Sequence, residues 1–535
     1  MADADAIVIG SGHNGLVAAF CLAQAGWRVV VIERAAKIGG AVRTENVTLP
    51  GFRHDLYATN LSLFVGSLVY RHHRADLERA GLHFITCHQA FASAYQDGRS
   101  VRITTHAEQT EAEFAQCSAF DREGWRRLVS IFRRVAPHVL PFTSMPLASA
   151  QAAAQALRML KGLRGGVLEL RHVIFGSSRQ LVDRFFRTEE AKGALLPWAF
   201  HLDFGPDVKG GAAFAFLAAV SAHLNGLVVA QGGADAIATA LRRLIEDRGG
   251  IICTATEVTE VLVEDGRAVG VRTADGDILS AARAVIANVT PRLLFGRLLP
   301  AYSVPDEVRK RAFGFRYGPG VFMVHLALSR HLAWKAGEDL HRFMYVHLNG
   351  KADEIAATYA QCTNGLLPAR PLIVVSQPTH ADPSRAPTGS AVMRLQVRAV
   401  PAIIAGDAAG SIRARHWTGA KEAFADRIVA QLEEHAPGAR DLILARHVMS
   451  PDDFERENPN LIGGDCVSGS HHLDQNYLAR PFPRWTRYRT PVERLFMVGA
   501  STWPGGGVNA ASGYLVAADL LRHTGKKARE RGVEG

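Results

Sequence analysis

Three glycines near the start of the chain, Gly10, Gly12 and Gly15, have a spacing that suits phosphate binding. They follow the apolar run AIVI and open a helix-like segment that begins near His13 and ends at Gly26. In a G-x-G-x-x-G turn, the first glycine permits a tight turn, the second leaves room for a pyrophosphate, and the third lets helix and strand pack closely. The free N–H groups of the helix then face the phosphates. The pattern predicts a dinucleotide site between a strand and a helix.

A carboxylate stands where the ribose of such a dinucleotide would lie. Glu33 ends WRVVVIE, which reads as the second strand. It can accept hydrogen bonds from ribose hydroxyls and would repel a 2′-phosphate, which disfavours NADP. Beyond it, Gly39 and Gly40 let the chain run close to a cofactor, and Arg43 offers a cation to the phosphates. NAD dehydrogenases do not ordinarily continue in this way.

A second glycine-rich segment stands near the other end of the chain. Residues 494–499, RLFMVG, read as a strand, and Pro504 with Gly505–Gly507 reads as a loop of little side-chain bulk. Residues 508–521 then read as a helix. Its N-terminus would offer backbone donors to an anionic group, such as the pyrimidine end of a reduced flavin. We predict that the two chain ends fold together around one cofactor.

A third informative segment, residues 228–291, lies mid-chain. Ile237, Leu241 and Leu244 have helical spacing, and Asp-Gly pairs at 265–266 and 275–276 predict tight turns between short strands. The run ARAVIAN reads as a further buried strand.

These motifs resemble the phytoene desaturase-like flavoproteins of the FAD-containing amine oxidase superfamily. The sequences that carry the resemblance are GSGHNG, GGAVR, GGADAIATAL, TEVTEVLVEDGRAVGV and GASTWPGGGVNAASG. The nearest branch holds the carotenoid ketolase-like proteins and the pyridine nucleotide-disulfide oxidoreductase domain-containing protein 2 group. The resemblance implies FAD as cofactor, with Val258 against the adenine. It implies cofactor contacts at Gly10, Gly12, His13, Asn14, Gly15, Glu33, Arg34, Gly40, Ala41, Arg43, Val258, Gly499, Ala500, Gly507 and Val508.

The resemblance also implies the fold class and the domain organisation. A chain of 535 residues is too long for one ordinary core. We expect an α/β protein in which a Rossmann-type FAD-binding domain is interleaved with an α+β substrate domain. The FAD-binding domain is predicted from residues 1–70, 226–300 and 485–535, and the substrate domain from 71–225 and 301–484. Strands at 316–329 and 390–400 and a helix at 417–438 are predicted within the substrate domain.

The chemistry expected from the resemblance is oxidation of an apolar, carotenoid- or isoprenoid-like substrate, by desaturation or oxygenation, with hydride transfer to flavin N5. Amine oxidation on the same scaffold and flavin binding without turnover are the alternatives, and no catalytic side chain is identified by spacing. No second G-x-G-x-x-G follows a mid-chain strand, and the six cysteines form no close pair. Oxygen or a quinone is therefore the expected electron acceptor.

Other partners are disfavoured by composition and spacing. His471 and His472, with Asp474 nearby, could suggest metal ligands, but adjacent histidines usually point apart, so no metal site is predicted. The formal charge of +10 comes with no nucleic-acid-binding motif, so no nucleic-acid partner is expected. Neither a run of eighteen apolar residues nor a signal peptide is recognised, which favours a cytoplasmic protein.

Two basic and apolar segments leave peripheral membrane contact open. Residues 122–140 and 156–176 both mix arginines or lysines with apolar side chains at helical spacing. Such helices lie on anionic bilayers, or they pack their apolar stripe into the protein. The sequence gives no expectation for the oligomeric state.

Overall fold

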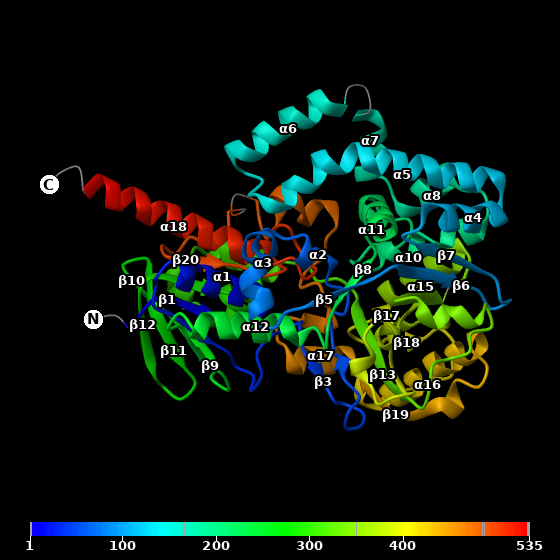
Figure 1. The fold of residues 1–535 in the computed structure, drawn as a ribbon. Coiled ribbons are helices and arrows are strands. Elements are labelled where there is room, and N and C mark those ends of the chain that lie inside the picture. Colours follow the sequence, from blue (N-terminus) through cyan, green and yellow to red (C-terminus); the bar gives the residue numbers. More distant parts are fainter. Residues whose placement is uncertain (1–2, 164–166, 349, 484, 486, 532–535) are drawn as a thin grey trace.

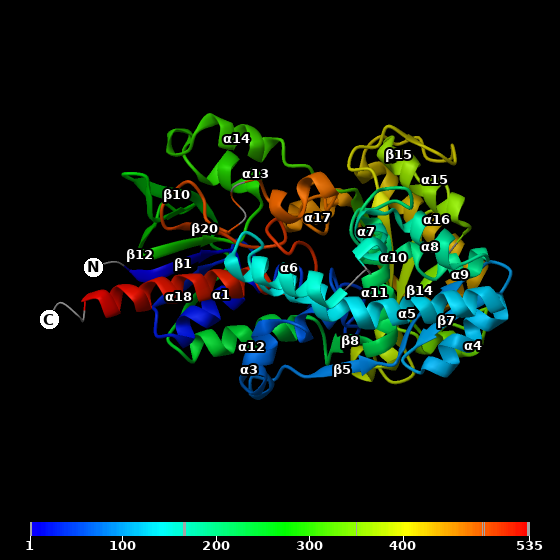
Figure 2. The ribbon, with the colours of Figure 1, turned by 90° about the horizontal axis from the view of Figure 1, so that it is seen from above.

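The chain folds into two lobes that lie side by side, each built around one large sheet (Figure 1). The computed structural model describes residues 3–163, 167–348, 350–483, 485 and 487–531. Both chain ends belong to the same lobe, and the other lobe carries a layer of helices on its sheet (Figure 2).

The sheet of the first lobe collects strands from both ends and from the middle of the chain. Its parallel part has the order β20 (Leu495–Met497), β12 (Ile278–Ala287), β1 (Ala4–Ile9), β2 (Val29–Ile32) and β9 (Ile251–Cys253). These runs are rich in valine, isoleucine and alanine, as expected of parallel strands that are covered on both faces. Because β1 pairs with both β12 and β2, the first glycine turn lies at the centre of the sheet.

Three helices cover one face of this sheet. They are α1 (His13–Gln24), α12 (Asp235–Glu246) and α18 (Ala511–Arg531), which share one apolar core with the sheet. In α12 the predicted stripe of Ile237, Leu241 and Leu244 is buried in that core. The helix near the C-terminus begins at Ala511 rather than at residue 508. Ala510 adopts a left-handed φ of 57°, and the Asn509 side chain accepts the Ala511 N–H, so the turn before Ala511 is not helical.

The opposite face is covered by a meander and short helices. Strands β10 (Val258–Glu264) and β11 (Arg267–Thr273) run antiparallel to each other, and β11 pairs with the first half of β12. The predicted turns at 265–266 and 275–276 are confirmed between these strands. Val258, Val261 and Val271 pack with α14 (Asp306–Phe313) over the sheet.

The second lobe has a seven-stranded sheet that is largely antiparallel. Its order is β19 (Ile443–Met449), β13 (Gly320–Leu328), β17 (Ala391–Val400), β16 (Ile373–Ser376), β14 (Tyr345–Leu348), β6 (Gln89–Ala94) and β7 (Ser100–Thr104). The strands predicted at 316–329 and 390–400 correspond to β13 and β17. The helix predicted at 417–438 is α16 (Trp417–His435). It packs on one face of the sheet, where Phe424 contacts Phe322.

The other face of the second sheet carries the helical layer. Helices α5 (Ala119–Val139), α8 (Ser178–Phe185), α10 (Leu196–Ala199) and α11 (Gly211–Asn225) form one core with it. Neighbouring strand residues alternate between the two faces, as strand geometry requires: Tyr345 packs under the helical layer, and Val346 packs toward α16.

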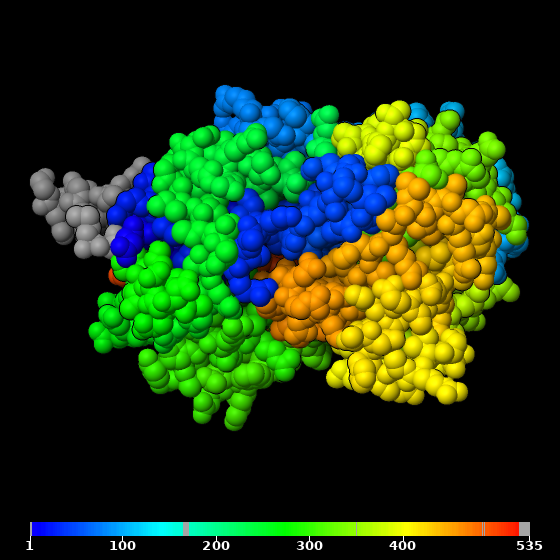
Figure 3. Space-filling model, turned by 90° about the horizontal axis from the view of Figure 1, so that it is seen from below, coloured from blue at the N-terminus to red at the C-terminus, as the bar shows by residue number. Residues whose placement is uncertain are grey.

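The two lobes are joined by several crossings of the chain. Strand β5 (Phe84–Cys87) pairs with β8 (Leu227–Ala230). On the face shown in Figure 3, the N-terminal part of the chain meets the segment around Glu457, whose carboxylate accepts the Tyr57 hydroxyl at 2.9 Å. All strands of the first sheet fall within 1–70, 226–300 and 485–535, and all strands of the second fall within 71–225 and 301–484. We propose the predicted domain division on this basis.

Candidate functional site

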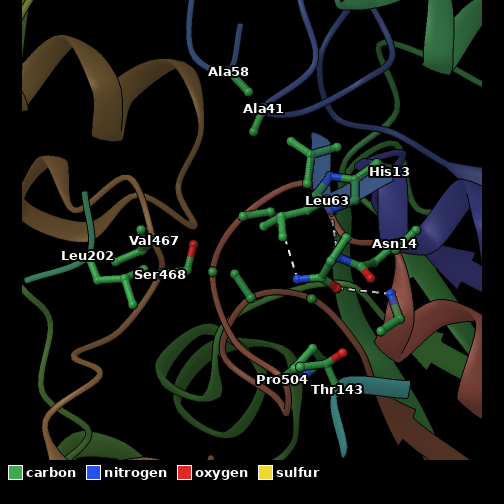
Figure 4. Close-up of a pocket in the computed structure, with 18 of the residues that line it drawn as sticks. His13, Asn14, Ala41, Ala58, Leu63, Thr143, Leu202, Val467, Ser468 and Pro504 are labelled. Carbon is green, nitrogen blue, oxygen red and sulfur yellow. Dashed lines mark hydrogen bonds between the residues drawn. The ribbon is translucent and has the colours of Figure 1, made fainter. Parts of the chain in front are cut away.

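A cavity of about 1690 Å³ lies where the two lobes meet. It exceeds the range of about 300–1,000 Å³ typical of small-molecule pockets, so it has room for a dinucleotide and a second molecule. Figure 4 shows part of its lining, with His13, Asn14 and Leu63 on one side and Leu202, Val467 and Ser468 on the other.

The structure brings nearly all of the predicted cofactor residues into the wall of this cavity. They are Gly10, Gly12, His13, Asn14, Glu33, Arg34, Gly40, Ala41, Arg43, Val258, Gly499, Ala500, Gly507 and Val508. Gly15 is the exception, because it faces the contact between strand and helix and not the cavity. A Cβ at Gly15 would stand 2.3 Å from the Gly10 carbonyl oxygen, so this glycine permits strand and helix to pack closely.

The first turn of α1 is free to bind an anion. No side chain among the described residues caps the helix, so its first N–H groups are available to a ligand in the cavity. A Cβ at Gly12 would lie 2.7 Å from the amide nitrogen of Asn288, and one at Gly40 would lie 3.0 Å from the Cα of Gly12. Burial lowers the pKa of His13 to about 4, so its imidazole is neutral beside the phosphate position. The backbone here fits a pyrophosphate.

Glu33 directly follows β2 at the edge of the cavity and is held in place by the loop around it. One carboxylate oxygen accepts the Ser11 backbone N–H at 2.8 Å and the Ser11 hydroxyl at 2.7 Å. The other accepts the Ala35 N–H at 2.8 Å. These bonds orient the carboxylate, and the oxygen that accepts only the Ala35 N–H keeps a lone pair for a ribose hydroxyl.

The two predicted arginines are engaged with neighbouring segments. Arg34 donates to the carbonyl oxygens of Arg456 at 3.1 Å and Glu457 at 3.0 Å. Arg43 pairs with Glu45 and stands 3.5 Å from the Glu457 carboxylate. Because two carboxylates balance its charge, the contact of Arg43 with the phosphates stays a prediction.

Hydrogen bonds and a close backbone contact join the two ends of the chain beside the first glycine turn. The Asn14 side-chain oxygen accepts the Ser512 hydroxyl at 2.9 Å, and Ser512 in turn accepts the Gly499 N–H at 2.9 Å. A Cβ at Gly513 would lie only 1.9 Å from the Asn14 carbonyl oxygen, so α1 and α18 touch backbone to backbone. The sequence analysis missed Ser512 and Gly513. It also missed Asn288, although Asn288 follows a predicted strand and touches the cavity.

Arg480 and His471 form hydrogen bonds that hold the second glycine-rich segment in place. Arg480 is fully buried and donates to the Ala500 carbonyl at 2.6 and 3.0 Å and to the Ser470 carbonyl at 2.7 Å. The Nε2 of His471 accepts the Gly506 N–H at 2.8 Å, and burial holds the pKa of this imidazole well below its ordinary value. These contacts fix the loop that faces the cavity.

The histidine pair therefore has a structural role in the loop. Asp203 accepts the His471 N–H at 3.0 Å, and its backbone carbonyl lies 3.0 Å from His472 Nε2. Asp474 instead pairs with Arg316 at 2.7 Å. Within the part of the chain that the structure describes, no group of three or more His, Cys, Asp or Glu side chains is placed to hold a metal ion.

The half of the cavity away from the glycine turns is mainly apolar. Its wall includes Phe132, Val135, Phe142, Met145, Leu202, Phe214, Phe216 and Leu217. Trp503 connects this wall to the glycine loop, because its indole N–H donates to the carbonyls of Phe142 and Met145, each at 3.2 Å. An apolar molecule in this half would therefore lie next to the cofactor half. None of the helices among the described residues has the length and hydropathy needed to cross a bilayer.

Comparison with known proteins extends these observations. Residues 15–521 match the family described as flavin containing amine oxidoreductase. Pyridine nucleotide-disulfide oxidoreductase domain-containing protein 2 of Mus musculus is 29% identical, over 97% of this chain and 93% of its own. A limonene dehydrogenase component of Castellaniella defragrans is 25% identical (97% and 95%), and the neurosporene-forming phytoene desaturase of Cereibacter sphaeroides is 26% identical (96% and 93%).

Solved structures share the fold over nearly the whole chain. A putrescine oxidase variant superposes with a TM-score of 0.63 at 17% identity, covering 97% of this chain and 99% of its own. An oxidoreductase from Methanosarcina mazei gives a TM-score of 0.60 at 18% identity with the same coverage. The predicted α/β flavoprotein fold and the predicted resemblance are confirmed.

Proposed function

The chain belongs to the family of flavin-containing amine oxidoreductases and is an FAD-dependent oxidoreductase, and from this premise we propose that it oxidises the carbon skeleton of an apolar, isoprenoid-like substrate. The observation that carries the proposal is one cavity that runs from the glycine turns to a largely apolar wall. Two relatives support the substrate class, because their names refer to limonene and to phytoene.

Different residues of the site would bind the cofactor and the substrate. FAD, when bound, supplies the acceptor for the hydride, which carries the two electrons of the oxidation. The N-terminus of α1 would hold its pyrophosphate, Glu33 its ribose, and the Gly505–Gly507 loop with the start of α18 its ring system. Leu63, beside Gly507, and Phe142, on the apolar side, would exclude water and hold the substrate carbon next to the ring.

Amine oxidation is less well supported by the cavity. A substrate held between two aromatic faces needs ring separations of about 7 Å, twice the van der Waals contact distance. Tyr477 and Trp503 both line the cavity, but their ring centroids are 5.7 Å apart, so these two rings pack on each other. Arg394 and Arg398 also line the cavity and would repel an alkylammonium group.

We also infer a peripheral membrane contact through α6 (Ala150–Leu163). Residues 122–139 of the segment 122–140 lie in α5, and the apolar residues Trp125, Leu128 and Phe132 are buried, so this helix packs inward. Helix α6 instead lies at the outer surface (Figure 1), with Leu157 60% and Leu160 51% exposed. Of the predicted segment 156–176, residues 164–166 lie outside the described residues. An exposed apolar and basic helix suits an anionic lipid surface.

The experiment that tests the function is anaerobic mixing of the FAD-loaded protein with phytoene, limonene or putrescine. We expect an isoprenoid to bleach the visible flavin band and putrescine to leave it unchanged. The variant Ala213→Phe, which places a large side chain in the cavity, should slow the bleaching without loss of FAD. Phytoene offered in anionic vesicles should react faster than in neutral ones if α6 contacts the membrane.

The outcomes of this experiment separate the alternatives. Bleaching by putrescine alone would establish amine oxidation, and bleaching by none of the three would favour a flavin-binding protein without turnover. Adding oxygen or a soluble quinone to the bleached protein then identifies the electron acceptor, which we infer to be one of these two.

A further inference from the structure

Strand β17 presents three polar side chains to the cavity. Arg394, Gln396 and Arg398 alternate with Met393, Leu395 and Val397 along the strand, and alternate residues share one face of a sheet. The apolar set packs toward α16, whereas all three polar residues line the cavity. The apolar cavity therefore has a polar patch on one side, which holds two guanidinium groups.

Arg394 is only 5% exposed and is incompletely paired. Its Nη1 donates to the backbone carbonyls of Tyr57 and Asp55, the latter at 3.4 Å. Its Nε is buried and makes no hydrogen bond with a described residue. Burial, together with the positive charge of Arg398, lowers the pKa of Arg394.

Arg398 is likewise paired only with neutral groups. Its Nη1 donates to the His201 carbonyl and to the Cys466 sulfur, each at 3.1 Å, and its Nη2 lies 3.2 Å from His201 Nδ1. The Nε of Arg398 is also buried and lacks a partner among the described residues. The His201 ring is held by stacking on Trp198, with centroids 4.7 Å apart, so this arrangement is fixed by packing.

Within the described chain, neither arginine forms an ion pair with a carboxylate, and the carboxylates around them have other partners. Asp55 pairs with Arg385 at 3.0 Å. Glu457 accepts the Tyr57 hydroxyl, and Asp465 accepts three backbone N–H groups, from Gly318, Val467 and Gly469. Buried charges in proteins are normally paired, so the buried Arg394 and the partly buried Arg398, neither with an ion-pair partner among the described residues, point to an anion supplied from outside the chain.

We propose that Arg394 and Arg398 bind the carboxylate of a substrate whose remaining part is an apolar chain, with Gln396 as a further hydrogen-bond donor. Guanidinium groups bind carboxylates through charge-assisted hydrogen bonds, and the apolar wall of the same cavity accommodates the chain. The inference rests on the proposed function and narrows its substrate class to an isoprenoid-like chain that ends in a carboxylate.

The test is binding to the oxidised, FAD-loaded protein of three probes that share one chain: dodecanoate, dodecanol and dodecylammonium. Titration calorimetry and the shift of the flavin spectrum give the affinities. We expect dodecanoate to bind at least about tenfold more tightly than dodecanol, as hydrogen bonds to charged groups imply. Dodecylammonium should bind most weakly of the three.

Substitutions test whether Arg398 is responsible for the preference for dodecanoate. Arg398→Gln should remove most of the preference for dodecanoate, and Arg398→Lys should keep part of it. Arg446→Gln, which changes an arginine on β19 that pairs with Glu422 and Asp426, is the matched control and should leave the preference unchanged.

Equal binding of dodecanoate and dodecanol by the wild-type protein would overturn the inference, even if a variant fails to fold. Equal binding would also be observed if the bound FAD itself neutralised the charges of the two arginines, and the inference would be overturned in that case too. Because these measurements need bound FAD but no turnover, they are independent of the anaerobic test. A protein that binds dodecanoate selectively yet oxidises no isoprenoid would contradict the proposed function and support the acid site.

Discussion

Replacing Gly513 with alanine is expected to weaken FAD binding by a factor of about 5 to 150, from the overpacking cost of about 1–3 kcal/mol. The new Cβ would stand 1.9 Å from the Asn14 carbonyl oxygen, which belongs to the backbone of α1 and cannot rotate away. Helices α1 and α18 must therefore move apart, which displaces both the first glycine turn and the second glycine loop. Equilibrium titration of the apoprotein with FAD measures the effect.

The matched control for this substitution is Gly276→Ala. Gly276 lies in a tight turn with a φ of 91°, and its Cβ would meet no atom within 4 Å. This variant should lose stability through backbone strain, by about 1–2 kcal/mol, and yet keep the wild-type affinity for FAD. If Gly513→Ala bound FAD as tightly as this control, the close contact of the chain ends would not be part of the cofactor site.

Replacing Glu33 with alanine is expected to weaken FAD binding about 10- to 150-fold, because hydrogen bonds to a charged group contribute about 1.5–3 kcal/mol. The substitution removes the predicted ribose contact. It also frees the Ser11 and Ala35 N–H groups that Glu33 now accepts, so the turn around the cofactor loses its support. Glu33→Gln retains one acceptor oxygen and should lie between alanine and wild type.

The order of the FAD affinities of the variants tests the role of Glu33. We expect wild type to bind FAD most tightly, followed by Glu33→Gln and then Glu33→Ala. Glu246→Ala, which removes an exposed carboxylate that pairs with Arg242 on α12, should match wild type. An unchanged affinity in Glu33→Ala would exclude Glu33 as the ribose-binding residue.

The parts of the fold that the sequence analysis predicted correctly are determined by local patterns. The first glycine turn, the Asp-Gly turns near Gly266 and Gly276, and the stripe of α12 each depend on a few neighbouring residues. Glycine spacing and apolar periodicity record such local structure directly. Strands β13 and β17 were predicted for the same reason.

The missed residues act through contacts between distant segments. Ser512 and Gly513 contact Asn14 at the opposite end of the chain, and Arg480 holds the Ala500 carbonyl from within the other predicted domain. A periodic pattern in one segment carries no information about which distant segment it meets.

Strand β17 shows a further limit of pattern reading. Its alternation of polar and apolar residues is typical of a strand with one face in solvent. Here the polar face, with Arg394 and Arg398, lines an internal cavity instead. Only the position of β17 under the helical layer distinguishes a solvent-facing strand from one that faces a ligand.

The measurement that tests the central claim most directly is equilibrium titration of the apoprotein with FAD and, separately, with FMN. If the two chain ends bind one dinucleotide between them, one FAD should bind per chain. FMN lacks the adenylate half that Glu33 and Val258 are predicted to hold, so it should bind at least about tenfold more weakly. Equal affinity for FMN and FAD, or no binding of either, would contradict the account.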